Sequence, residues 1–492
     1  MFDLDINPNL ALMCGAVASI GSVYWIFPKV LKVAKLKELV DNPNARKLQK
    51  APVPVLGGIA VYFGLLLGTL IFAALCPSKG VLGGNVCVFL ATCVMLYVGS
   101  LDDVVGLTPR SRIGIEVVAI LGLIFGSGMC VDSLHGLWGI YDFSWWVAVP
   151  LTVFAGVGVI NAYNMIDGVN GLSSGLCIMS SAVLSVMFWK RGDYPDCALA
   201  LSFCFSLIPF LLHNVFGKTS KMFIGDAGTM TMGMLVTWFI IRVLSSNNVM
   251  VALPKDSNLD MGLVAMMVAI ASVPLADTLR VMFTRVKNGR SPFSPDKSHL
   301  HHKFIATGVS HSITALSEIL INLSVILVWY VSYKLGASVE LQLYLVVAAA
   351  AVLVWGTYYF LRYHEKNNTP YLQKLREMNK ATHFGHTHWW LAFQRWLDRG
   401  AYEDYLQVLK EKNPDAEVVL DEQTSCAVDL VNFLQGRAGA SISLITQSCG
   451  AKESVLFECI EALEKEGVIA VSERSEDGKP KELKLMKLRP RC

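Results

Sequence analysis

The chain has 492 residues, of which 53% are hydrophobic and only 16% are charged. An average soluble domain carries about 25% charged residues, so this composition excludes a single soluble domain, a disordered chain and a collagen-like fibre. The formal net charge of +3 is too small to indicate a nucleic-acid partner. We therefore predict a protein that crosses a membrane several times.

The hydrophobic residues are concentrated in the first three quarters of the chain. Residues 1–361 hold 23 Lys and Arg against 19 Asp and Glu, whereas residues 362–492 hold 19 against 20. This shift predicts a membrane domain over 1–361, an interfacial helical linker over 362–420 and a cytoplasmic domain over 421–492. The 12 cysteines show no CxxC spacing, which favours packing roles over a disulfide framework.

A helix that crosses a bilayer needs roughly 20 mostly apolar residues. The predicted fold is thus an all-α membrane domain with about 11 transmembrane helices. The predicted spans are 10–28, 55–76, 81–101, 113–130, 145–163, 171–189, 197–213, 228–244, 259–280, 313–333 and 339–361.

Basic residues fix the expected orientation, because cytoplasmic loops carry an excess of Lys and Arg. Loops on the side that follows the first span hold 16 such residues, and loops on the opposite side hold 5. The N-terminus is therefore predicted outside, and the C-terminal domain in the cytoplasm.

Polar residues cluster at the span ends on the predicted cytoplasmic side. A site there is expected, because loops on the outer side are short and chemically plain. In chain order the candidates are Asp102, Asp103, Asn161, Asn164, Asp167, Asn170, Asn214, Lys221, Phe223, Asp226, Arg290, His299, His301 and His302.

Several carboxylates with few thiols favour a hard cation such as Mg²⁺, which binds one or two carboxylates together with substrate phosphates. Histidine, lysine and arginine side chains neutralise phosphate charge. The glycines near the acidic residues either admit a phosphate to backbone amides or allow close helix packing; they are Gly168, Gly171, Gly225 and Gly228. The pattern predicts chemistry on a diphosphate, which depends on positioning and electrostatics.

Other interpretations remain open at this stage. The Asp102–Asp103 pair would also suit a helix end exposed to water, and the three histidines would suit zinc, although no Cys or acidic ligand lies near them. Three further ionisable residues within or beside the spans either serve function or face water: Glu116, Arg242 and Asp277.

Five segments in order resemble a known family over about residues 45–310. They read PVPVLGGIAVYFG, VGSLDDVVGLTPRSRIGIE, NAYNMIDGVNGL, KMFIGDAGTMTMG and GRSPFSPDKSHLHHKF. The sequence is similar to the bacterial polyprenyl-phosphate N-acetylhexosamine-1-phosphate transferases. The last segment looks more like the GlcNAc-1-phosphate branch than the phospho-MurNAc-pentapeptide translocase branch.

The resemblance implies transfer of a sugar-1-phosphate from a UDP-sugar to undecaprenyl phosphate, with release of UMP. It also implies a need for Mg²⁺, with Mn²⁺ as a substitute, and a place in the bacterial inner membrane with a cytoplasmic active site. The reaction would begin a cell-surface polysaccharide. The donor is expected to be UDP-GlcNAc, with another UDP-N-acetylhexosamine or UDP-MurNAc-pentapeptide as the alternative.

The resemblance also implies residue roles. Asp102 and Asp103 match the catalytic acidic pair, and Asp226 matches the main metal ligand, with Asp167 as a second ligand. Phe223 matches the aromatic residue that stacks on uracil.

The remaining matches concern the donor. Asn164 and Asp167 match the nucleotide-side polar motif, and the three histidines match the motif that contacts the diphosphate. The family usually has a second Asp where this chain has Asn170, which keeps hydrogen bonding but loses the charge. Substrate contacts are expected also from Asn161, Asn214, Lys221 and Arg290.

The tail shows a different pattern. A Trp-rich stretch at 383–412 predicts a helix at the membrane interface. Residues 424–492 predict three helices and a β-hairpin, which resemble a winged-helix domain. Because residues 420–492 hold 10 basic against 12 acidic groups, they favour a protein-interaction module over DNA binding.

Two other classes of function compete with the enzyme. A secondary transporter with a cytoplasmic regulatory domain would place its polar groups near the middle of the bilayer. A membrane-tethered winged-helix regulator would need far fewer spans. The sequence leaves open a homodimer.

Overall fold

The computed structural model describes most of the membrane-embedded part of the chain and parts of the tail. The chain forms two compact units, Met1–Ala381 and Thr382–Cys492. The described residues are 6–41, 52–77, 81–246, 261–292, 297–381, 388–398, 426, 430, 433–434, 439–449, 453–465, 469–475 and 480–485.

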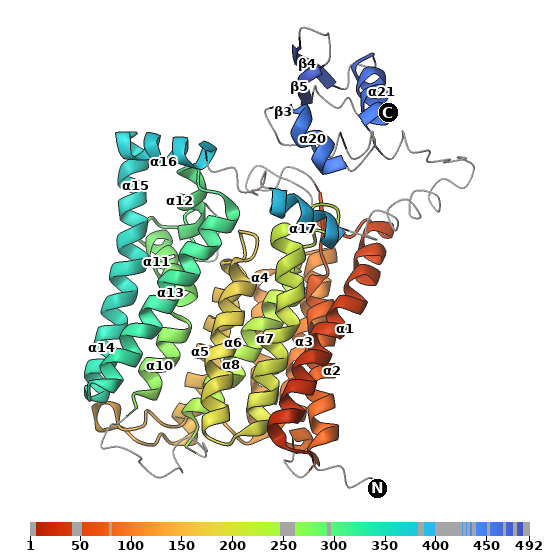
Figure 1. Ribbon diagram of the computed structural model, residues 1–492. Coiled ribbons are helices and arrows are strands. Elements are labelled where there is room, and N and C mark those ends of the chain that lie inside the picture. The colour runs from red at the N-terminus through yellow and green to blue at the C-terminus, as the bar shows by residue number, and fades with distance from the viewer. Residues whose placement is uncertain are drawn as a thin grey trace. The chain divides into compact units, whose positions relative to one another are not determined.

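Long helices dominate the first unit, and successive long helices run in alternate directions (Figure 1). The start of α2 and the ends of α3 and α5 therefore lie on the same side of the unit. The helices are α1 Pro8–Leu36, α2 Gly57–Leu75, α3 Val81–Val105, α4 Pro109–Ser127, α5 Trp145–Met165, α6 Leu172–Lys190, α7 Tyr194–Phe216, α8 Gly225–Leu244, α10 Leu263–Ile270, α11 Ser272–Lys287, α12 Leu300–Ala306, α13 His311–Lys334, α14 Val339–Ala350, α15 Thr357–Asn367 and α16 Pro370–Ala381.

Nine helices among the described residues are long and apolar enough to cross a membrane, which shows a multi-pass membrane protein. The predicted count of eleven included α4 and an unbroken span at 259–280. Helix α4 is present, but it carries Arg110, Arg112 and Glu116 in its first half and is not among the nine. The other predicted span is broken, so α10 and α11 give at most a tenth crossing.

The break between α10 and α11 bends the chain by 74°. Asn322 of α13 satisfies the backbone groups that the break exposes. Its Nδ2 donates to the carbonyls of Ala269 and Ile270, and its Oδ1 accepts from the N–H of Val273 at 2.9 Å. A buried helix end needs such partners, so the side chain of Asn322 stabilises the bend.

Glycine contacts bring α2, α3 and α8 together at the end that carries the polar motifs. A Cβ on Gly58 would lie 2.4 Å from the backbone nitrogen of Gly228, and one on Gly99 would lie 2.4 Å from the Cα of Ala227. No larger residue fits at either contact. The start of α8 is consequently held between the start of α2 and the last turns of α3.

A short antiparallel ladder covers the same end of the unit. Strand β1 (Val40–Asp41) pairs with β2 (Val53–Pro54), and Val55 forms a parallel bridge with Phe223. The PVPVLGG and KMFIGD motifs therefore lie side by side.

The last helices of the first unit support the histidine segment. Helix α14 continues through a π-helical turn, Ala351–Gly356, into α15. Lys303 of α12 pairs with Glu365 of α15 at 2.8 Å, and Arg376 of α16 donates to the carbonyl of Ala306. The contacts divide the chain after Ala381, whereas we expected the membrane domain to end at 361.

The second unit contains a Trp-rich helix and a small α+β region. Its core is formed by buried residues that include Leu430, Ile445, Leu456 and Leu483. The three strands pair antiparallel in the order β3-β5-β4. The elements are α17 His388–Asp398, β3 Ala440–Ser441, α20 Ile442–Cys449, α21 Glu453–Lys465, β4 Ile469–Arg474 and β5 Pro480–Leu485. The small C-terminal sheet is confirmed, and the winged-helix topology stays a prediction, because much of 399–439 lies outside the described residues.

Candidate active site

Arg112 of α4 is the centre of a polar network at one end of the membrane unit. Its Nη1 contacts Asp102 Oδ2 at 3.2 Å. Its Nη2 donates to the side-chain oxygens of Asn161 and Asn164 at 3.1 and 3.2 Å. Its Nε lies 3.5 Å from Glu116 Oε1, one turn further along α4. One planar guanidinium thus joins α3, α4 and α5, which a lysine ammonium does not do with the same geometry.

Asp103 holds the first turn of α8. Its Oδ1 accepts from the N–H of Asp226 at 2.9 Å, and its Oδ2 accepts from the N–H of Ala227 at 3.2 Å. Gly225 makes this approach possible, because its φ is +73° and a Cβ there would lie 2.4 Å from Asp103 Oδ2. The second member of the predicted acidic pair therefore caps a helix start, where a carboxylate is stabilised by the helix dipole.

Asn164 connects the Arg112 network to Asp226. Its Nδ2 donates to Asp226 Oδ1 and to the Thr229 hydroxyl. Because its Oδ1 accepts from Arg112, its amide is oriented by its partners on both sides. Four predicted site residues from three segments distant in sequence are thus hydrogen-bonded into one cluster: Asp102, Asn161, Asn164 and Asp226.

Asp167 lies in the short loop between α5 and α6, and its Oδ1 accepts from the Ser173 hydroxyl. Burial raises the pKa of Asp167 to about 6, against the lowering effect of Ser173. The nearby carboxylate of Asp226 raises this pKa as well. Asp167 and Asp226 are therefore close enough to repel one another when both are ionised.

The histidine motif packs against the same loop. The rings of His299 and His301 are stacked, with centroids 5.6 Å apart and an interplanar angle of 9°, and the His302 ring lies 4.3 Å from His301. A Cβ on Gly168 would lie 2.2 Å from His301 Nε2. Gly168, next to Asp167, is therefore required for the ring to approach this closely.

Burial holds the pKa of His301 well below its usual range, and the neighbouring His302 and His299 rings lower this pKa further. His301 is consequently neutral at pH 7. Toward a phosphate it offers one N–H donor rather than a full positive charge.

Lys221 and Phe223 lie in the segment before α8. The N–H of Phe223 donates to the Pro54 carbonyl at 2.8 Å, and its carbonyl accepts from the N–H of Gly57 at 3.0 Å. The Lys221 Nζ is 5.8 Å from the Phe223 ring centroid. Burial lowers the pKa of Lys221 below its usual value.

Three predicted substrate-binding residues lie outside the Arg112 hydrogen-bond network. Asn214 is buried and joins two loops, because its Oδ1 accepts from the N–H of Gly171 and its Nδ2 donates to the Met222 carbonyl. This geometry assigns Asn214 to loop support rather than substrate contact. The Arg290 side chain is exposed beyond the end of α11, and Asn170 is half-buried in the α5–α6 loop.

The ionisable residues near the spans, whose roles the sequence left open, all have partners, and Glu116 and Asp277 are fully buried. Glu116 accepts from Asn161 Nδ2 at 2.6 Å. Arg242 pairs with Asp193 at 2.9 Å and with Asp196, at the opposite end of the unit. Asp277 pairs with Arg280 and His299. Each of the three residues thus has a partner within the protein, and none is simply a charge on a water-facing loop.

Sequence reasoning missed Arg112, Thr229 and Ser173 as site residues. Arg112 was counted only among the charges that fix topology. A signal was present, because Arg112 lies one helical turn before Glu116 on a span that otherwise carries few charges. The hydroxyl residues gave no comparable signal.

The donor set of the site suits the expected Mg²⁺ better than zinc. Among the described residues, no group of three His, Cys, Asp or Glu side chains forms a metal site by itself. Mg²⁺ is usually held by one or two carboxylates, waters and substrate phosphates. Asp167 and Asp226 would supply the two carboxylates of that pattern, whereas a closed zinc site at the histidines does not fit the described residues.

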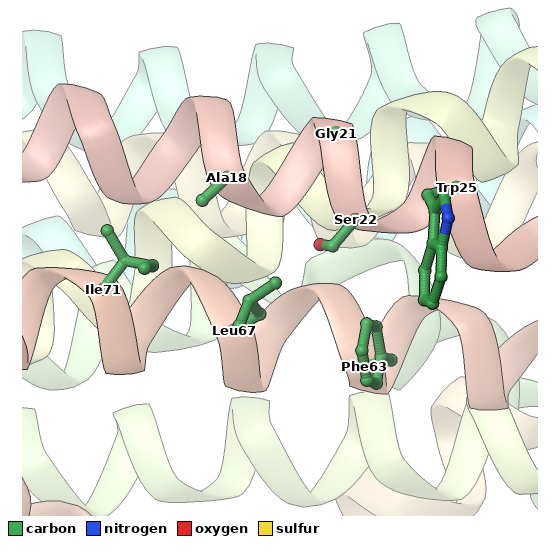
Figure 2. A pocket seen from close by; sticks show the side chains of 7 residues that line it. All are labelled: Ala18, Gly21, Ser22, Trp25, Phe63, Leu67 and Ile71. Atoms are coloured by element: carbon green, nitrogen blue, oxygen red, sulfur yellow. The ribbon is translucent and has the colours of Figure 1, made fainter.

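An open apolar groove of about 400 Å³ lies apart from these polar residues. It runs between α1 and α2, and Figure 2 shows the Trp25 and Phe63 rings beside the small Gly21 and Ser22. Its lining offers almost no polar group for a sugar nucleotide. The lining residues are Ala18, Gly21, Ser22, Trp25, Phe63, Leu67 and Ile71.

Comparison with known proteins agrees with this geometry. The glycosyl transferase family 4 model matches residues 85–244, which contain most of the polar network. An undecaprenyl-phosphate alpha-N-acetylglucosaminyl 1-phosphate transferase of Escherichia coli K12 is 30% identical over 285 residues, covering 56% of this chain and 72% of the relative. A probable undecaprenyl-phosphate N-acetylglucosaminyl 1-phosphate transferase of Bacillus subtilis 168 is 29% identical over 314 residues, covering 64% and 82%.

The chain belongs to glycosyl transferase family 4. It is a membrane enzyme that transfers a sugar phosphate, and its branch is that of the undecaprenyl-phosphate GlcNAc-1-phosphate transferases. The family model ends at residue 244. The histidine segment and the last helices of the membrane unit follow that region.

Proposed function

We propose that this enzyme transfers GlcNAc-1-phosphate from UDP-GlcNAc to undecaprenyl phosphate and releases UMP. The observation that carries the proposal is the hydrogen-bonded cluster of Asp102, Arg112, Asn164 and Asp226 at one end of the membrane helices. The names of the relatives support the lipid acceptor and the sugar. The product would begin a cell-surface polysaccharide in a bacterial inner membrane.

Asp167 and Asp226 would hold Mg²⁺, for which Mn²⁺ can substitute. When bound, the cation neutralises charge on the diphosphate oxygens. Within the chain, Asn164 and Ser173 each hold one oxygen of these two carboxylates in place. This orientation matters because phosphoryl transfer depends on positioning.

The reaction joins an oxygen of the lipid phosphate to the β-phosphorus of the donor and breaks the bond from that phosphorus to UMP. A phosphate monoester has a second pKa near 6, so the nucleophile is largely ionised at pH 7 without a strong base. The role proposed for Asp102 is to fix Arg112 near the reacting phosphates. Asp103 fixes the start of α8, whose N-terminal dipole favours anions.

The donor would be held by the surrounding motifs. His299, His301 and His302 would contact the diphosphate, and neutral His301 would donate one hydrogen bond without competing for a proton. Phe223 would stack on uracil. The Lys221 ammonium, 5.8 Å from the Phe223 ring centroid, would attract the phosphates.

The test is UMP release by the purified full-length protein with undecaprenyl phosphate and Mg²⁺. We expect turnover with UDP-GlcNAc to exceed that with UDP-GalNAc and UDP-MurNAc-pentapeptide. Asp226→Asn should remove nearly all activity, and Asp142→Asn, a change at an exposed residue outside the site, should not. Near-normal activity of Asp226→Asn at saturating Mg²⁺ would refute the metal assignment, and preference for another donor would refute the sugar.

The site is proposed to face the cytoplasm. Single cysteines at position 167 and at the exposed position 290 should then react with a membrane-impermeant maleimide only in inside-out vesicles. Labelling of position 167 from the periplasmic side would reverse the orientation.

The C-terminal domain is proposed to bind a protein partner, because it is net acidic. Tight binding of duplex DNA by the full-length protein would contradict this.

A further inference from the structure

Asp277 of α11 makes a buried set of contacts that the proposed chemistry does not use directly. Its Oδ2 lies 2.7 Å from Nδ1 of His299, and its Oδ1 lies 2.6 Å from Nη2 of Arg280. The N–H of Leu300 donates to the same carboxylate at 3.1 and 3.2 Å. The exposed fraction of Asp277 is 0% and that of His299 is 4%, so water does not compete effectively for these bonds.

This arrangement fixes the proton on the His299 ring. An ionised carboxylate only accepts hydrogen bonds, and here it already accepts from an arginine and a backbone N–H. Nδ1 of His299 must therefore carry the proton that it shares with Asp277. The second ring nitrogen, Nε2, is left as an acceptor in the neutral ring and becomes a second donor in the protonated ring.

The carboxylate is itself held in place from a third helix. The Arg280 guanidinium lies over the Tyr358 ring of α15, with its central carbon 3.5 Å from the centroid, and its Nη2 also donates to the Ser298 carbonyl. Arg280, Asp277 and His299 thus form one rigid chain of contacts. It reaches from α15 through α11 to the first residue of the histidine motif.

We propose that Asp277 is a positioning residue that sets the tautomer and the ring orientation of His299 for the transferase reaction. The idea rests on the proposed function, in which His299 contacts the diphosphate. Asp277 acts only through His299 and touches no substrate. An oriented imidazole is a better partner for a phosphate than one that rotates, because its hydrogen-bonding nitrogen is already aimed.

Asp277→Asn is a specific test because the amide cannot reproduce both contacts. Arg280 faces Oδ1 and His299 faces Oδ2. An amide has an oxygen at only one of these two positions and an NH₂ group at the other, so it cannot accept from both donors in this geometry. If the oxygen serves Arg280, the NH₂ group faces Nδ1 and favours the tautomer protonated on Nε2. Asp277→Glu keeps the two acceptor oxygens and is the conservative variant.

The experiment combines ¹⁵N-histidine NMR of the full-length protein in nanodiscs with UMP release from UDP-GlcNAc. His299→Gln assigns the His299 signals. We expect the Nδ1–H form in the wild type and its loss in Asp277→Asn. The turnover number, kcat, should fall about 100-fold, as for other residues that orient a functional histidine, and KM for UDP-GlcNAc should change little. Asp277→Glu should recover part of the activity.

Asp196→Asn is the matched control, because Asp196 is also a buried helical carboxylate paired with an arginine, at the opposite end of the unit. It should cost stability without changing kcat per folded molecule or the His299 signals. An unchanged tautomer and kcat in Asp277→Asn would overturn the proposal, as would equal losses of activity in both variants. Should the wild type release no UMP, the proposed function fails, and the NMR result still decides whether Asp277 sets the tautomer.

Discussion

At the scale of single residues, the candidate site depends on side chains that satisfy several partners at once. Arg112 contacts Asp102, Asn161, Asn164 and Glu116. Glu116 is fully buried, and a buried carboxylate that loses its partners is strongly destabilised. The orientation of Asn164, and through it of Asp226, thus follows from one guanidinium.

Arg112→Lys should therefore lower kcat/KM on the order of 100-fold, since a small misplacement of catalytic groups costs about that much. Lysine keeps the charge but replaces the planar fork by one ammonium group. Arg110→Lys, at an exposed residue of the same helix, is the control and should leave UMP release unchanged. Equal kinetics in the two variants would show that the fork geometry is unimportant.

Polar residue types at span ends predicted most of the cluster, including Asp102, Asn164 and Asp226. They did not separate substrate contacts from internal support. Asn214 carries the same amide group as Asn164, yet this amide forms hydrogen bonds with backbone groups of two loops. The role of each asparagine depends on the groups that its amide contacts, and the residue types at the span ends do not reveal them.

At the scale of elements, the start of α8 determines where Asp226 lies. Two backbone N–H groups of its first turn donate to Asp103, and glycine contacts with α2 and α3 leave no room for movement. A charged acceptor at a helix N-terminus contributes roughly 1–2 kcal/mol. Asp103 therefore stabilises the start of α8, in addition to the catalytic role proposed for the acidic pair.

Asp103→Ala should lower the free energy of unfolding by about 1–2 kcal/mol, because both N–H groups lose their acceptor. Asp103→Asn retains one acceptor oxygen and should cost less stability, while its activity still falls through loss of the charge. Thermal unfolding in detergent and UMP release measure the two effects. If Asp103→Asn released UMP at the wild-type rate, the role of Asp103 would be limited to capping α8.

Helix order and direction were predictable from hydropathy and charge, whereas the break at Ala271 was not. Residues 263–270 are uniformly apolar. Pro274, in the first turn of α11, signals a helix start, but it does not indicate a bend of 74°. The bend is stabilised by Asn322, some fifty residues away in sequence. A local pattern cannot reveal such a partner, so the sequence predicted one straight span.

At the scale of the whole molecule, the chain divides into a membrane unit and a tail unit at Ala381 and Thr382. All residues of the proposed site lie in the first unit. The tail unit has its own buried core, which includes Leu430, Leu456 and Leu483. Catalysis is therefore expected to need only the membrane unit.

Truncation after Ala381 should leave Mg²⁺-dependent UMP release at about the wild-type rate per folded molecule in detergent. Helix α16 must be kept, because Arg376 contacts the carbonyl of Ala306 beside the histidine segment. Truncation after Asn367 is the comparison, and it should reduce activity. Loss of turnover in the longer, still folded variant would mean that the tail unit completes or gates the site.

The central claim is that the sugar leaves its donor together with one phosphate. The most direct measurement uses UDP-GlcNAc labelled with ³²P at the β-phosphate, undecaprenyl phosphate, Mg²⁺ and the purified full-length protein. We predict that the label moves into the lipid fraction and that the released nucleotide is unlabelled UMP. Label that remains in the aqueous phase as UDP, with the sugar alone on the lipid, would contradict the account.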